Sequence, residues 1–238
     1  MSVIRNSSDM EEFFRYELAP QPPSLFHDGV MRKTQKSALG DLLKGFVDHY
    51  STIPENSIYV IDGGYLLHKV IWSTPSSYGD ISQMYITYVL KHYGVGTTVV
   101  FDGYSDVIST KVVEQSRRAQ RNMSSDIIFD DNTPTRTSQA SFLSNSHNKS
   151  RLIEGLIKKM PNFGIRVKQA EADGDALIIS TALDVVEAAE VPVVVVGTDT
   201  DLLVMLLARA IPSTNIFMLC CNIPTILYYT ASMKLNML

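Results

Sequence analysis

The chain has 238 residues, 45% of them hydrophobic and 19% charged, so it is long enough to bury one core and has the composition of a globular protein. Its formal net charge of -4 neither favours nor excludes a polyanionic partner. The only cysteines, Cys220 and Cys221, are adjacent, which excludes a disulfide framework and a cysteine zinc site. This cysteine usage favours an intracellular location, nuclear or cytoplasmic.

Neither end of the sequence predicts a targeting or membrane segment. The N-terminal residues lack the apolar run of a signal peptide. The most apolar tract, residues 211–231, contains prolines and asparagines at positions 212, 215, 222 and 224. These residues interrupt a spanning helix, so no membrane span is expected.

Predicted strands and helices alternate along most of the chain. Residues 1–55 are expected to form an N-terminal extension, with a helical stretch around 37–50. The predicted core covers 56–238 and opens with a strand over 57–62, a helix over 65–70, a helix over 84–93 and a strand that ends at Asp102. This β-α-β order predicts parallel strands joined by a crossover.

The second half of the predicted core begins with two polar segments. Residues 103–123 are basic and expected to be helical from Ser109, whereas residues 124–150 are rich in Ser, Thr, Asn and Asp and read as a mobile insertion. The alternation then resumes with helices over 151–160, 172–189 and 202–210 and strands over 165–169, 191–196 and 216–220. The fold class predicted is α/β, with a mostly parallel central sheet flanked by helices.

Acidic residues follow three of the predicted strands. Asp62 and Asp102 each end one, and Asp199 and Asp201 follow the valine-rich strand, while Glu171 and Asp173 are expected to open a helix. The carboxyl ends of parallel strands meet at one edge, where ligands bind. Carboxylates gathered there repel one another unless a cation lies between them, and Mg²⁺ or Mn²⁺ prefers oxygen ligands of this kind. The pattern therefore predicts a metal site.

Basic residues are concentrated in the segment after Asp102. They are Lys111, Arg117, Arg118 and Arg121. Lys111 and Arg118 are seven residues apart and share one face of a regular helix. Cations placed there would neutralise a phosphodiester and the charge that develops on it in a transition state.

The order of these blocks resembles the flap endonuclease branch of the PIN-like (5′ nuclease) superfamily over residues 57–207. The resemblance implies a flap-endonuclease-like core and a nuclease that hydrolyses structured or single-stranded DNA or RNA with two Mg²⁺ or Mn²⁺ ions. It implies a catalytic role for Lys111 and Arg118 and substrate contacts for Arg117 and Arg121. The implied metal ligands are Asp62, Asp102, Glu171, Asp173, Asp199 and Asp201.

The resemblance also has gaps, which leave alternatives open. No Asp or Glu follows Asp201, so the chain is expected to be a family member truncated at its C-terminus, without one further metal ligand and the duplex-binding module. A catalytically eroded protein that binds nucleic acid or a protein partner is the alternative. A phosphatase with an Asp-Thr-Asp nucleophile fits poorly, because Leu202 and Leu203 follow that motif. Each strand-end Asp could also be only a turn former or a helix N-cap.

Overall fold

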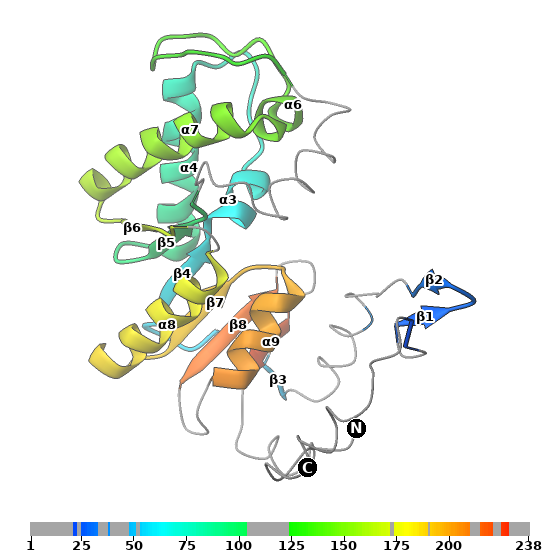
Figure 1. Ribbon diagram of the computed structural model, residues 1–238. Helices are drawn as coiled ribbons and strands as arrows, with labels where there is room; N and C mark the ends of the chain where they lie inside the picture. Colours follow the sequence, from blue (N-terminus) through cyan, green and yellow to red (C-terminus); the bar gives the residue numbers. More distant parts are fainter. Residues whose placement is uncertain are drawn as a thin grey trace, which may run out of the picture. The chain divides into compact units, whose positions relative to one another are not determined.

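The computed structural model describes residues 21–22, 25–32, 38, 48–50, 53–103, 124–171, 174–189, 191–209, 215–220 and 225–228 (Figure 1). The chain divides into two compact units, residues 1–39 and 40–238. In the first unit, β1 (Phe26–His27) pairs with antiparallel β2 (Val30–Met31). Asp28 and Gly29 between them have φ of 49° and 76°. Positive φ at both residues of a two-residue loop is the backbone that a tight hairpin requires.

The second unit is built on a seven-stranded sheet with the order β3-β9-β8-β7-β4-β5-β6. Its five consecutive parallel strands are β8 (Ile216–Cys220), β7 (Val193–Val196), β4 (Ile58–Asp62), β5 (Thr98–Phe101) and β6 (Arg166–Gln169). β9 (Thr225–Tyr228) is antiparallel to β8, and β3 (Asp48–Tyr50) is antiparallel to β9. The predicted fold class, an α/β protein with a mostly parallel central sheet, is confirmed.

Both faces of the sheet are covered, which explains the unbroken valine runs of its central strands. On β7, Val194 and Val196 join one core and Val193 and Val195 join a second. The first core contains residues of α3 (Gly63–Lys69), α4 (Tyr78–Tyr93), α6 (Gln139–Ser144) and α7 (Ser146–Lys159). The second contains residues of α8 (Asp175–Ala189) and α9 (Thr200–Arg209). No described helix has the length and apolar character needed to span a bilayer.

Several element boundaries differ from the sequence expectations. Residues 48–50, expected to be helical, form β3, because β9 supplies the backbone partners of a strand. Helix α4 begins at Tyr78 rather than at 84, because Ser77 and Asp80 form a reciprocal capping box. The segment 124–150 contains α6 and the first residues of α7, which the prediction missed. Whether this segment is mobile stays a prediction.

Candidate functional site

Asp62 and Asp102 extend one face of the sheet at its carboxyl edge. Asp62 pairs with Val100 in the parallel register, and Asp102 lies two residues beyond Val100. Alternate residues of a strand point to the same face. Val60 and Val100 belong to the core with α8 and α9, so the two aspartates continue the face that these helices cover.

The end of β7 reaches the same place. Ile61 pairs with Val196, which places Gly197 beside Asp62. A Cβ built on Gly197 would lie 3.4 Å from the Asp62 Cβ and 2.8 Å from a Leu202 methyl group. Glycine therefore permits β7, the turn into α9 and Asp62 to approach this closely.

Three of the predicted site carboxylates accept hydrogen bonds at helix N-termini. Asp62 Oδ1 accepts one from the Gly64 N–H at 2.8 Å and caps α3. Asp102 Oδ1 accepts one from the Gly174 N–H at 2.8 Å, immediately before α8. Asp199 Oδ1 accepts one from the Asp201 N–H at 3.1 Å in α9. Asp62 is thus the N-cap of α3, while whether capping is its only role stays a question for the site proposal, and the helix termini also favour the ionised carboxylates.

The pKa of Asp62 is shifted by its surroundings. Burial raises its pKa above the ordinary value of 3.8, and the neighbouring charge of Asp102 raises it further. Hydrogen bonds from the backbone N–H groups of Gly64 and Tyr65 act in the opposite direction, as does the charge of Lys149. The two aspartates therefore repel each other across adjacent strand ends, and a cation between them would relieve that repulsion.

Lys149 is a site residue that the sequence analysis missed. It lies on α7 and is partly buried, and its charge lowers the pKa of Asp62. The pKa of His68 on α3 is lowered by desolvation and then by the same Lys149 charge. Lys149 has no local sequence signal, because only the folding of α7 and α3 onto one core brings its charge near Asp62 and His68. Lys149 lies inside the segment predicted as an insertion.

Two of the other acidic candidates, Glu171 and Asp201, follow β6 and β7, the strands that flank β5 and β4. Glu171 is exposed in the bend after β6, and α8 begins at Asp175, so the helix expected over 172–189 starts three residues later. Gly103 packs on this bend, since a Cβ on it would meet the Glu171 carbonyl oxygen at 2.4 Å. Asp201 is exposed in the first turn of α9. Asp173 lies outside the described residues.

The predicted basic contacts cannot be placed in the site, because all of them fall in the range 104–123, outside the described residues. They are Lys111, Arg117, Arg118 and Arg121. The described chain stops at Gly103, directly after Asp102, and starts again at Ser124. There the buried Asn145 and Asn148 side chains hold the chain by donating hydrogen bonds to the Ser124 carbonyl (2.9 Å) and to Ser124 Oγ (3.1 Å).

The donor set fits an oxygen-coordinated ion in part. Asp62 and Asp102 supply hard carboxylate ligands of the kind that Mg²⁺ takes. Within the described ranges, no three His, Cys, Asp or Glu side chains come together as a metal-holding group. The structure thus joins Asp62 with Asp102 and does not add Glu171, Asp199 or Asp201 to them.

Comparisons with known proteins add distant similarities to solved structures, of which two are described. No protein-family model matches the sequence, and no curated protein matches it. One solved structure of the catalytic core of Rad2 in complex with DNA substrate is similar with a TM-score of 0.46 and 14% identity, over 84% of this chain and 54% of that one. A second has a TM-score of 0.42 and 15% identity, over 84% and 52%. The chain thus spans about half the length of these structures.

Proposed function

We propose that the chain is a divalent-metal-dependent nuclease that hydrolyses phosphodiester bonds of structured or single-stranded nucleic acid, DNA or RNA. One observation carries the proposal: Asp62 and Asp102 end adjacent parallel strands and interact electrostatically. The Asp102 carboxylate is also held by the backbone at the start of α8. Carboxylates kept close at a strand edge in spite of their repulsion are the expected design of a cation site.

The proposed ions are Mg²⁺ or Mn²⁺, two in number, as the resemblance implies. Bound at this edge, they would supply Lewis-acid stabilisation of the phosphate oxygens and a more acidic water. Asp62 and Asp102 are the proposed central ligands, and the turns beside them would contribute the rest. Those further proposed ligands are Glu171, Asp173, Asp199 and Asp201.

The proposed substrate contacts come from the segment that directly follows Asp102. Lys111 and Arg118 are proposed to act on the scissile phosphate, and Arg117 and Arg121 to bind the neighbouring backbone. The packing of Gly103 against the Glu171 backbone supports this assignment, because it ties the beginning of the basic segment to the acidic edge. A flap-endonuclease-like core and an intracellular location, nuclear or cytoplasmic, belong to the same proposal.

A second candidate function is a catalytically eroded nuclease fold that binds nucleic acid or a protein partner. It is favoured by the absence of any three-residue metal-holding group within the described residues. In that case the Asp62 and Asp199 carboxylates would serve only as helix caps. The two candidates differ in one property, because only the nuclease requires a divalent ion for a chemical step.

The test is cleavage of labelled single-stranded, duplex and 5′-flap DNA and RNA in Mg²⁺, Mn²⁺ or EDTA. The variants are Asp102→Asn and Asp199→Asn/Asp201→Asn, with Asp184→Asn on the exposed side of α8 as the matched control. We expect EDTA-sensitive cutting that falls by about a hundredfold or more in both site variants and is unchanged in the control. Equal cutting by parent and site variants would refute the assignment. Binding by the folded parent without cutting would favour the eroded protein.

A further inference from the structure

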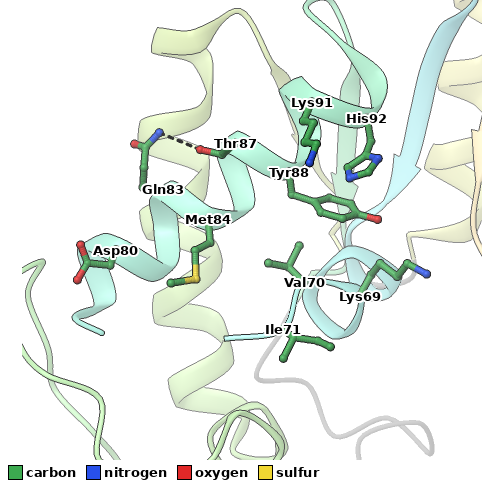
Figure 2. A pocket seen from close by; sticks show the side chains of 10 residues that line it. All are labelled: Lys69, Val70, Ile71, Asp80, Gln83, Met84, Thr87, Tyr88, Lys91 and His92. Carbon is green, nitrogen blue, oxygen red and sulfur yellow. Dashed lines mark hydrogen bonds between the residues drawn. The ribbon is translucent and has the colours of Figure 1, made fainter. Parts of the chain in front are cut away.

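A groove of about 540 Å³ lies beside the C-terminal end of α3 and along one face of α4 (Figure 2). Its volume is in the range of natural small-ligand sites. The floor is apolar, formed by the buried Val70 and the partly buried Met84. Ile71 forms an edge and is 84% exposed, which is unusual for an isoleucine. Among the described residues, the groove thus offers apolar area that no other side chain covers.

Positive charge and an aromatic ring lie at one end of this groove. Lys91 and His92 lie beside Tyr88 on α4, and Lys69 lies at the end of α3 with its side chain extending away from the ring; all three are exposed (Figure 2). The Tyr88 and His92 rings pack with their centroids 4.4 Å apart. Tyr88 itself is partly buried, so only part of its ring is accessible. An accessible aromatic surface beside flexible cations is the arrangement by which proteins bind single-stranded nucleic acid without regard to sequence.

At the opposite end of the groove lies the Asp80 carboxylate, which accepts hydrogen bonds from a neighbouring residue of the protein. Asp80 Oδ2 accepts hydrogen bonds from the Ser77 N–H at 2.9 Å and from the Ser77 hydroxyl at 2.8 Å. These bonds hold the pKa of Asp80 below its usual value, so the carboxylate stays ionised. An anionic ligand is therefore repelled from the Asp80 end and attracted to the lysine end, which gives the groove a polarity.

We infer that this groove binds a nucleotide unit of single-stranded nucleic acid, with phosphates against Lys69 and Lys91 and a base against Tyr88 and Ile71. The inference rests on the proposed function, because it extends the path of the substrate away from the acidic edge. Helix α3 links the two places: Asp62 caps its first residue and Lys69 ends it. A seven-residue helix is about 10 Å long, so one strand spans both ends.

The test is the binding of fluorescein-labelled oligothymidine, measured by fluorescence anisotropy in EDTA at several salt concentrations. Lys69→Gln/Lys91→Gln is compared with Lys158→Gln/Arg209→Gln, which removes the same charge from exposed positions on α7 and α9. We expect the groove variant to bind the oligonucleotide at least about tenfold more weakly than the parent. The slope of log K plotted against log salt concentration should also become less steep by about 1 to 1.5. The control variant should keep the parent slope.

A second comparison separates the base from the phosphates. Tyr88→Leu should weaken binding of oligothymidine about tenfold, since stacking is lost, and leave binding of an abasic oligonucleotide of equal length unchanged. Thermal unfolding of each variant verifies the fold. Equal affinity of the parent and Lys69→Gln/Lys91→Gln would overturn the inference and leave cleavage to be judged separately. Groove-dependent binding without metal-dependent cleavage would support the inference while the proposed nuclease fails.

Discussion

The backbone N–H of Gly174 donates a 2.8 Å hydrogen bond to Oδ1 of Asp102, a residue 72 positions earlier in the chain. This contact fastens the start of α8 to the end of β5. A Cβ built on Gly174 would lie 2.7 Å from the same oxygen, closer than Cβ atoms come to non-bonded heavy atoms in proteins. The bond therefore depends on glycine, and any side chain at this position must displace the Asp102 carboxylate.

We accordingly expect Gly174→Ala to lower the free energy of unfolding by about 1–3 kcal/mol, because the methyl group is overpacked. The matched control is Gly155→Ala on α7, where a Cβ meets no atom within 4 Å. That change should raise stability by up to about 1 kcal/mol, since alanine favours the helix. Urea unfolding of both variants measures the difference, and a loss in Gly155→Ala that matched Gly174→Ala would contradict the assigned contact.

The raised pKa of Asp62 predicts a stability that depends on pH. Its pKa in the folded protein lies above the value of 3.8 expected for the unfolded chain, so the unfolded state loses its proton first as pH rises. The contribution of Asp62 to stability is fully present below its pKa in the unfolded chain. It is lost as pH rises through its pKa in the folded protein. Asp62→Asn abolishes this loss, and in EDTA it should be more stable than the parent at neutral pH.

Thermal unfolding in EDTA between about pH 4 and about pH 8 tests this, with Asp184→Asn as the control. The stability advantage of Asp62→Asn should shrink toward the acid end of the range. Addition of Mg²⁺ should stabilise the parent more than Asp62→Asn, because the ion binds the folded site. A variant less stable than the parent throughout the range would contradict the electrostatic account of Asp62.

Tyr85 provides a second pH-dependent prediction at the centre of the core. Its hydroxyl accepts a 2.9 Å hydrogen bond from Trp72 Nε1 and donates one of 2.8 Å to the Leu67 carbonyl. Tyr85→Phe leaves the indole N–H without this acceptor and should cost about 1–3 kcal/mol near neutral pH. Tyr88→Phe serves as the control and should change stability by less than about 0.5 kcal/mol.

Burial raises the pKa of Tyr85 from 10.0 to about 12. The contribution of the Tyr85 hydroxyl to the stability of the folded state is therefore fully present below about pH 10 and is lost as pH rises through about 12. The difference in free energy of unfolding between the parent and Tyr85→Phe should therefore become smaller as pH rises over that range. Trp72, the only tryptophan of the chain, reports the transition by its fluorescence. If the stability difference between the two proteins became larger with rising pH, the Tyr85 hydroxyl would not be buried and hydrogen-bonded as described.

Substitution of Lys149 should change the pKa of the neighbouring His68. The positive charge of Lys149 lowers the pKa of both His68 and Asp62, so Lys149→Gln should raise both values. An NMR titration of the His68 ring measures the first directly. Lys158→Gln, also on α7 and exposed, should leave the titration as it is in the parent. If the pKa of His68 were the same in Lys149→Gln as in the parent, the charge of Lys149 would not reach His68.

Much of the fold was predictable because the central strands are apolar on both faces. The run Val193–Val196 is recognisable without any partner, and β4 and β5 end where the prediction placed them, within one residue. β3 and β9 were missed, because a short strand is stabilised by its neighbours in the sheet more than by its own residues. The early start of α4 was missed because the capping box precedes its apolar stripe.

For the candidate site, the sequence by itself determined which carboxylates end buried strands, since alternating burial and turn residues are local properties. Only the tertiary structure decided that β5 lies beside β4, so that Asp62 meets Asp102, and that Lys149 comes from α7 to join them. It also decided that Glu171 stands in a bend before α8. Strand order and helix packing depend on contacts between residues far apart in the chain, which no local pattern specifies.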